Sequence, residues 1–223
     1  MISQKPFFCF TIGTFLSELF HTYWKKYCNS YRCNPDCIGI WDRTMEIYRS
    51  YFDFIPYVNR GHFFDLDMLD VGYCDLFRKL EFDQEPDYGY TEDEEIIMYT
   101  MRAFFASPIQ ISCNVTQIDE FLLSVLCNEE VIAINQDAAF DGAKPYLLEE
   151  GEKKMVHIWK RKLENGDYAY AIFNLGKTEE TSHIYFEDTC QVRDVWAKED
   201  LGSFKTFTAI TKPHTVKLIR VTP

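Results

Sequence analysis

The sequence lacks any apolar run that approaches the roughly 18 residues of a membrane-spanning helix, so no membrane span is expected. Basic residues are also in short supply. The chain has 23 Lys and Arg against 35 Asp and Glu, which gives a formal net charge of -12. Nucleic-acid binding generally needs a basic face, so this balance argues against a nucleic-acid partner. An acidic net charge is compatible with a neutral ligand.

Typical metal-binding motifs are scarce as well. Three of the eight cysteines, Cys28, Cys33 and Cys37, lie close together, but no Cys-x-x-Cys pair occurs and histidine is sparse around them. This spacing is only weakly typical of a zinc site, so we expect neither a metal nor another cofactor. A disulfide bond or buried thiols explain these cysteines better.

Two features bear on whether the chain is secreted. Lys5 and the apolar run at 6–16 resemble a secretion signal, but no small-x-small cleavage site follows. We favour the alternative, a buried strand that ends at Gly13. The tripeptide Asn-Val-Thr at 114–116 is a formal N-glycosylation sequon, which matters only if the chain is secreted.

Hydrophobic patterning divides the chain into two parts, which we interpret as two domains. Residues 1–140 alternate short apolar runs with helical periods, which predicts α/β structure. Residues 141–223 contain short apolar runs separated by turns, typical of an all-β antiparallel sandwich. A capping box at Thr91 and Glu94 predicts a helix that runs to about Ser107.

Individual elements follow from the same patterns. In the first part we expect helices at 41–51 and 118–126, strands at 7–10, 63–69 and 109–112, and a short turn or strand at 131–134. In the second part we expect strands at 156–159, 168–173, 183–186, 192–196 and 215–221, with a tight turn at 165–166.

Two loops carry charged residues suited to catalysis. Arg32 stands four residues before Asp36, so its guanidinium could hold a substrate while the aspartate moves a proton. An ordinary salt bridge within the loop would have the same spacing. Asp65 and Asp67 lie in the expected strand at 63–69, and alternation would place both on one face. Such a pair repels unless one acid has a raised pKa or a charged partner.

Three segments resemble glycoside hydrolase family 27, which contains α-galactosidases and α-N-acetylgalactosaminidases. Cys-Asn-Ser-Tyr-Arg-Cys-Asn-Pro-Asp at 28–36 resembles the family's loop after barrel strand six. Gly-His-Phe-Phe-Asp-Leu-Asp-Met-Leu at 61–69 resembles its strand seven. Glu-Val-Ile-Ala-Ile-Asn-Gln-Asp at 130–137 is similar, almost letter for letter, to the corresponding segment of the family. The resemblance implies the second half of a (β/α)8 TIM-type barrel, about strands five to eight, followed by an antiparallel β-sandwich.

The resemblance also implies a chemistry, the retaining hydrolysis of terminal α-galactosyl groups, and roles for five residues. One carboxylate attacks the anomeric carbon while a second donates and then withdraws a proton. By position, Asp36 resembles the general acid/base, and Arg32 resembles the residue that holds a sugar hydroxyl. Asp65, Asp67 and Asn29 are expected to be structural. The implied substrate is an α-galactoside or α-N-acetylgalactosaminide, and the implied location is extracellular or lysosomal.

Several positions depart from the family pattern. The family's nucleophile lies in a Lys-x-Asp motif on strand four, and this chain is expected to begin at about strand five, without that strand. Ile12 and Gly13 replace a sugar-binding Glu and a Trp. Phe64 and Leu66 replace an Asn and a Pro of strand seven.

The cysteine pairing of the family is also altered. Thr11 stands where the family has the cysteine that bridges to the position of Cys28. Cys9 is one substitute for the missing partner. Which pairing forms, if any, is left open by the sequence.

The sequence supports three interpretations. The chain is the C-terminal part of a family 27 glycosidase, inactive alone because it carries the acid/base but not the nucleophile. Alternatively it is a non-catalytic carbohydrate-binding or scaffold relative, or a product without function that is insoluble alone. Half a barrel has two unpaired edges, so we expect a homodimer or a requirement for an N-terminal half.

Overall fold

The computed structural model describes residues 9–11, 26–32, 34, 36–72, 89–140 and 142–223. The first part contains a parallel sheet with the order β1-β2-β3, formed by β1 (Cys9–Thr11), β2 (Ser30–Arg32) and β3 (Phe63–Phe64). An isolated parallel bridge joins Leu69 to Ile111. Three short parallel strands and one bridge do not by themselves establish a half-barrel, which stays a prediction.

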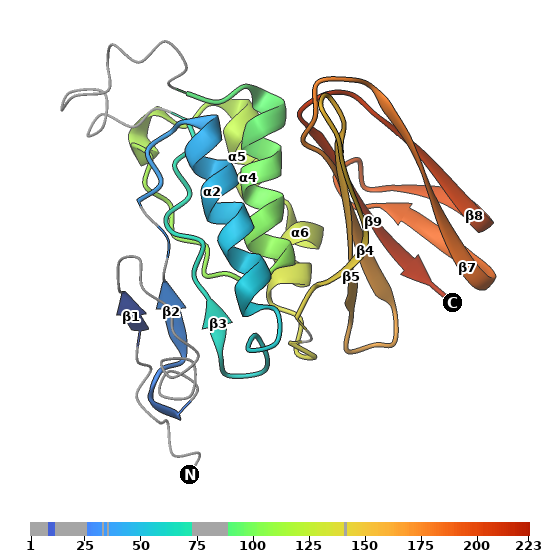
Figure 1. Ribbon diagram of the computed structural model, residues 1–223, viewed down its shortest axis with the longest axis horizontal. Helices are drawn as coiled ribbons and strands as arrows, with labels where there is room; N and C mark the ends of the chain where they lie inside the picture. The colour runs from blue at the N-terminus through green and yellow to red at the C-terminus, as the bar shows by residue number, and fades with distance from the viewer. Residues whose placement is uncertain (1–8, 12–25, 33, 35, 73–88, 141) are drawn as a thin grey trace.

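Helices lie between this sheet and a second, larger sheet (Figure 1), with α2, α4 and α6 in the middle of the molecule. The helical elements are α2 (Trp41–Ser50), η1 (Tyr51–Phe54), α4 (Glu92–Phe104), η2 (Val115–Gln117), α5 (Glu120–Leu126) and α6 (Glu129–Asn135). The expected helices at 41–51 and 118–126 are confirmed as α2 and α5, within two residues at each end.

The capping box at the start of α4 is confirmed. The Thr91 hydroxyl accepts from the Glu94 backbone N–H at 3.3 Å, and the Glu94 carboxylate accepts from the Thr91 N–H at 2.9 Å. The helix ends at Phe104 rather than near Ser107 because Ala106 adopts a left-handed conformation with φ 55°.

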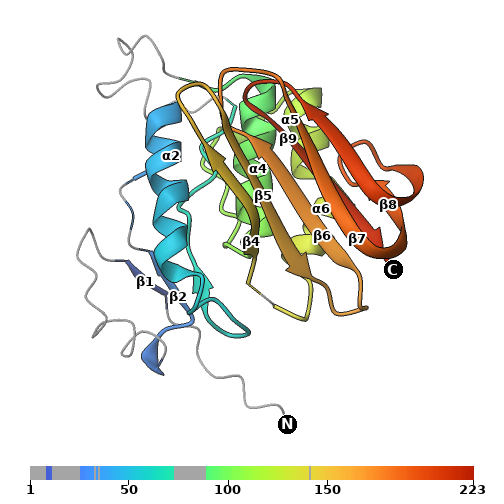
Figure 2. The ribbon, with the colours of Figure 1, turned by 45° about the vertical axis from the view of Figure 1, so that its right-hand side comes forward.

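The second part is a six-stranded antiparallel sheet with the order β4-β5-β6-β9-β7-β8. Figure 2 shows β5 and β6 beside the helices and β7 and β8 at the far side. The strands are β4 (Lys144–Glu150), β5 (Met155–Lys162), β6 (Tyr168–Asn174), β7 (Glu180–Asp194), β8 (Glu199–Thr211) and β9 (Thr215–Thr222).

Alternation along β5, β6 and β9 sends side chains into two cores. Trp159, Phe173 and Leu218 pack with the helices in one hydrophobic cluster. Ile158 and Ile172 face the other way and pack with residues of β7 and β8. Because successive side chains of a strand point to opposite faces, each of these strands is buried on both sides. Strands β5, β6 and β9 therefore lie between the helices on one side and strands β7 and β8 on the other.

Three expectations about individual elements are wrong. Residues 131–134 lie in α6 instead of a turn or strand, and the Asn128 side chain caps that helix by accepting from the N–H groups of Glu130 and Val131. The strand expected at 63–69 ends at Phe64, and the strand at 109–112 is reduced to the bridge at Ile111. Short apolar runs do not distinguish a buried strand from a buried helix.

The sandwich also differs in detail from the expectation. The separate strands expected at 183–186 and 192–196 form the one long strand β7, whose pairing with β8 is interrupted by a bulge between Tyr185 and Cys190. Strands β4 and β8 were not expected, because many of their residues are exposed and polar. The turn at 165–166 lies between β5 and β6 as expected, with Gly166 at φ 93°. The domain boundary at 140/141 stays a prediction.

A buried hydrogen-bond network joins α2 to β5. The Tyr48 hydroxyl accepts from Trp159 Nε1 at 2.7 Å and lies 2.7 Å from His157 Nδ1, and all three residues are fully buried. Burial raises the pKa of Tyr48 and lowers that of His157. The neutral forms of both side chains are therefore the stable ones in this core.

Tyr48→Phe is expected to lower the free energy of unfolding by about 2–3 kcal/mol, because two buried ring nitrogens lose their common partner. Urea denaturation of the chain measures this. Tyr185→Phe is the matched control on an exposed strand position, and it should stay within about 0.5 kcal/mol of the parent chain. A Tyr48 variant as stable as that control would contradict the expectation.

Candidate active site

Arg32, the last residue of β2, links two acidic loops. Its guanidinium forms a salt bridge with Asp36 in its own loop and another with Asp67, with 2.8 Å between Nη1 and Oδ1. Its Nε also donates to the Asn34 side chain at 3.1 Å. The two loops meet because β2 and β3 are parallel neighbours, so their carboxyl ends lie at the same edge of the sheet. The salt bridge expected from the sequence spacing is confirmed, and it belongs to a larger cluster.

The loop after β3 turns sharply at Asp67. This residue has φ 68°, a left-handed conformation that non-glycine residues rarely adopt. Its N–H donates to Asp65 Oδ1 at 2.9 Å, and its carboxylate accepts from the Cys37 N–H at 2.5 Å. The expectation that strand alternation places both acids on one face is therefore wrong, because the backbone leaves the strand conformation at this point.

Arg102 of α4 stabilises this turn by hydrogen bonds to its backbone. Its side chain is 1 % exposed, and its guanidinium donates to the backbone carbonyls of three consecutive residues. The acceptors are Asp67 at 3.1 Å, Leu66 at 3.0 Å and Met68 at 2.8 Å. Sequence reasoning missed Arg102. Its signal was an arginine among apolar residues of a predicted helix, since an arginine is rarely buried without partners.

The electrostatic conflict between the two acids is resolved as expected. Asp67 has Arg32 as a charged partner. Asp65 is buried, and this desolvation raises its pKa, with a smaller upward contribution from the charge of Asp67. The Asp67 N–H, which donates to Asp65, acts in the opposite direction. One acid therefore has the partner and the other has the raised pKa.

The three acids differ in accessibility. The side chain of Asp36 is 80 % exposed, whereas that of Asp67 is 3 % exposed and Asp65 is also buried. Asp36 is thus the acid of this cluster that an external ligand can reach. The buried acids hold the Arg32 side chain and the turn beneath it.

Asn29 precedes β2 and connects it to the neighbouring strand. Its side-chain amide donates to the Gly61 carbonyl at 3.2 Å, and its backbone carbonyl accepts from the Phe63 N–H at 2.7 Å. These contacts are structural and hold the start of β3 against β2. Ile12 and Gly13, which depart from the family's sugar-binding pattern, lie outside the described residues.

The disulfide considered from the sequence is not seen among the cysteines that the structure describes. No two cysteines in the described part of the chain lie at disulfide distance. Cys37, Cys113 and Cys190 are buried thiols, and burial raises the pKa of the latter two. The thiol of Cys37 lies 3.8 Å from the Tyr90 hydroxyl. Cys33 and the side chain of Cys9 fall outside the described residues.

The residues that the structure describes contain no cluster of three or more side chains suited to hold a metal ion. No helix among them has the length and apolar character needed to cross a membrane.

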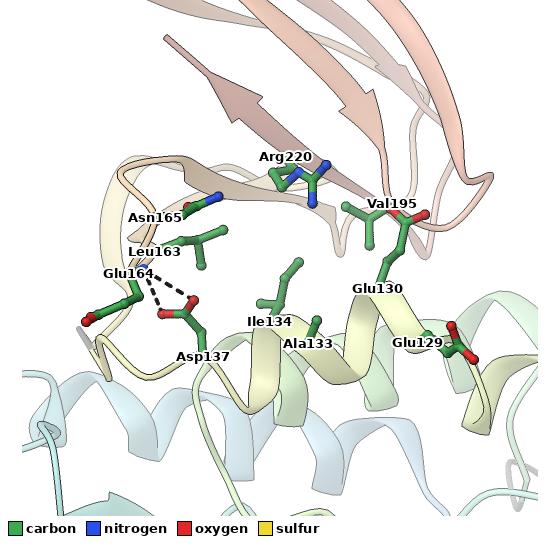
Figure 3. Close-up of a pocket in the computed structure, with 10 residues that line it drawn as sticks. All are labelled: Glu129, Glu130, Ala133, Ile134, Asp137, Leu163, Glu164, Asn165, Val195 and Arg220. Carbon is green, nitrogen blue, oxygen red and sulfur yellow. Dashed lines mark hydrogen bonds between the residues drawn. The ribbon is translucent and has the colours of Figure 1, made fainter.

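The segment 130–137 connects the helices to the sandwich. Glu130 forms a two-point salt bridge with Arg193 of β7, at 2.6 and 2.9 Å, which lowers the pKa of Glu130. The Asp137 carboxylate accepts from the Glu164 N–H in the β5–β6 turn. Figure 3 shows a pocket of about 440 Å³ between these contacts, walled by α6 and the sandwich. None of the residues that line it belongs to the Arg32 cluster.

Comparison with known proteins agrees with this arrangement. Residues 153–221 match the family model described as the alpha galactosidase C-terminal beta sandwich domain. The chain is 26 % identical to a "Probable alpha-galactosidase" of Dictyostelium discoideum, covering 87 % of this chain and 49 % of the relative. It is also 26 % identical to alpha-galactosidase 2 of Arabidopsis thaliana, covering 87 % of this chain and 46 % of that protein.

Solved structures show the same likeness. A family 27 β-L-arabinopyranosidase from Geobacillus stearothermophilus superposes with a TM-score of 0.82 at 26 % identity, covering 96 % of this chain and 49 % of that one. Alpha-galactosidase I of Mortierella vinacea, at 21 % identity, shares the fold with a TM-score of 0.76 over 90 % of this chain and 55 % of its own.

These matches define a class of proteins in which α/β structure is followed by an antiparallel β-sandwich. The motifs and matches together confirm the resemblance of this chain to the C-terminal region of glycoside hydrolase family 27. The chain spans about half the length of the curated relatives that it matches.

Proposed function

We propose that this chain supplies the acid/base side of a retaining α-galactosidase site, with Asp36 as the general acid/base. The observation that carries the proposal is the exposed Asp36 carboxylate beside an arginine whose other side is held by buried Asp67. The cluster lies at the carboxyl edge of parallel strands, where barrel enzymes place their catalytic groups. The curated relatives that we compared are named α-galactosidases.

Each residue of the Arg32 cluster has a separate role in the proposed site. Asp36 donates a proton to the glycosidic oxygen and later withdraws one from water. Arg32 restricts the position of the Asp36 carboxylate and presents N–H donors beside it, which suit a sugar hydroxyl. Asp67 and Arg102 position Arg32 through the turn after β3. Attack on the anomeric carbon is assigned to a carboxylate outside these residues.

The proposed fold is the second half of a (β/α)8 barrel. The three parallel strands follow one another in sequence and in space, as consecutive barrel strands do. The parallel bridge between Leu69 and Ile111 supports a fourth position in the same direction. The remaining strands would then come from a preceding segment of the natural polypeptide.

The test uses the natural polypeptide that contains this sequence, isolated with an antibody to the sandwich. It should hydrolyse nitrophenyl α-galactoside, and proton NMR should show the α-anomer of galactose as the first product. Nitrophenyl β-galactoside is the control and should remain intact. A β-L-arabinopyranoside, the substrate type named for the Geobacillus relative, shows whether the site requires the hydroxymethyl group of galactose.

A second candidate is sugar binding without hydrolysis. One observation favours it: a pocket of about 320 Å³ on the sandwich is lined by four tyrosines, Tyr146, Tyr168, Tyr170 and Tyr185. Lys160 lies over the Tyr168 ring, with 4.0 Å between its ammonium nitrogen and the ring centre. Aromatic rings with a few polar groups are suited to a sugar ligand. Saturable galactose binding without turnover would favour this candidate over the enzyme, and neither binding nor turnover would contradict both.

A further inference from the structure

The Asn-Val-Thr tripeptide at 114–116 is the only N-glycosylation sequon in the sequence. The proposed galactosidase site makes no use of it. The tripeptide follows the bridge at Ile111 and leads through η2 into α5. Its structural setting therefore has to be explained separately.

The side chains of the sequon are already arranged around one another. Asn114 Oδ1 accepts from the Thr116 backbone N–H at 3.1 Å and from the Thr116 hydroxyl at 2.7 Å. The contact joins the asparagine and the hydroxyl residue that define an acceptor tripeptide. In an N-glycan the first sugar is joined to the other polar atom of this side chain, the amide nitrogen Nδ2.

Asn114 itself is half-buried, whereas the residues that follow it are exposed and include an apolar side chain. Val115 is 66 % exposed, and Thr116 and Gln117 are also exposed. Ile111 and Leu123, at either end of this stretch, are 46 % and 52 % exposed. Three large apolar side chains within 13 residues of a surface segment are a liability in solution. A hydrophilic glycan attached between them would shield them from other chains.

We propose that Asn114 is an N-glycosylation site of this protein. The donor is a lipid-linked oligosaccharide diphosphate in the lumen of the secretory pathway. A bond forms between Asn114 Nδ2 and the anomeric carbon of the first sugar. The bond from that carbon to the diphosphate oxygen breaks, and the lipid diphosphate leaves with the electron pair. The amide proton passes to a base of the transferase. The proposal does not depend on the proposed galactosidase activity.

The experiment directs the full chain into the secretory pathway of cultured eukaryotic cells with a cleavable leader. A C-terminal tag with one efficient acceptor sequon reports entry into the lumen. Only molecules that carry the tag glycan are scored. Digestion with peptide N-glycosidase in ¹⁸O-labelled water then marks each glycosylated asparagine for peptide mapping.

The parent chain should carry two glycans, one on the tag and one on Asn114. Asn114→Asp should carry only the tag glycan, and it keeps the Oδ1 acceptor of the turn, so it is the matched structural control. Thr116→Val should also lose the glycan, whereas Thr116→Ser should retain it because the hydroxyl remains. A tag glycan on the parent chain with Asn114 unmodified would overturn the proposal.

Discussion

Asp36→Asn is expected to lower kcat for an unactivated α-galactoside by about 10²- to 10⁴-fold in the natural polypeptide, the range that general acid–base catalysis contributes. The amide cannot donate a proton to the glycosidic oxygen or withdraw one from water. A substrate with a good leaving group, such as a dinitrophenyl α-galactoside, needs less help from an acid. Its first step should therefore be impaired much less than that of an alkyl galactoside.

The geometry makes this variant informative about chemistry rather than folding. The Asp36 side chain is 80 % exposed, so solvent screens its charge and the salt bridge contributes little to stability. Arg32, which is 13 % exposed, keeps its salt bridge with Asp67 in this variant. The urea midpoint should therefore stay close to that of the parent protein. Asp42→Asn, an exposed acid in the first turn of α2, is the matched control and should retain activity within about twofold. Turnover near the parent value in the Asp36 variant would rule out its acid/base role.

Arg102→Met is expected to lower the free energy of unfolding by about 3 kcal/mol or more, because several buried carbonyls lose a charged donor at once. Methionine has a similar length and no branch, so the loss of packing is small and the loss of hydrogen bonds dominates. The turn at Asp67 then has to keep its left-handed conformation without the hydrogen bonds from Arg102. Urea denaturation monitored by tryptophan fluorescence, with Trp159 fully buried, measures the effect.

Two further variants make the Arg102 result specific. Arg102→Lys keeps the positive charge but lacks the planar set of donors that reaches three carbonyls. Its stability should therefore lie between that of the parent protein and that of Arg102→Met. Arg43→Met removes an arginine that is 34 % exposed and forms a surface ion pair with Glu46, so it should change stability by about 0.5 kcal/mol or less. Equal effects of the Arg102 and Arg43 replacements would show that the buried contacts do not stabilise the turn.

Local signals in the sequence identified the elements that depend on neighbouring residues. The helix α2 follows from its apolar spacing, and the start of α4 follows from the Thr91–Glu94 box. The failures have a common cause. Helix α6 is a short apolar run, and its helical state depends on packing between α4 and the sandwich. Strand β8 is exposed and polar, and it is a strand because β7 pairs with it along most of its length.

The candidate site divides in the same way. Motif order and spacing singled out Arg32, Asp36, Asp65 and Asp67, and they pointed to the family that the comparisons support. The spacing could not show that Arg32 contacts Asp67 as well as Asp36, because that contact joins two loops more than thirty residues apart. The position of Arg102 among apolar residues was a signal of burial, but it could not show which groups Arg102 contacts, since they are backbone carbonyls of a distant loop.

The sequence by itself determined the class of protein, the separation into an α/β part and an antiparallel part, and the residue types available for proton transfer. These depend on composition, periodicity and motif order, which are properties of neighbouring residues. Only the tertiary structure decided which acid is exposed and which are buried, because burial depends on how β2, β3 and α4 pack together. Arg32 contacts both the exposed Asp36 and the buried Asp67, and Arg102 holds the turn at Asp67, through contacts between residues distant in sequence.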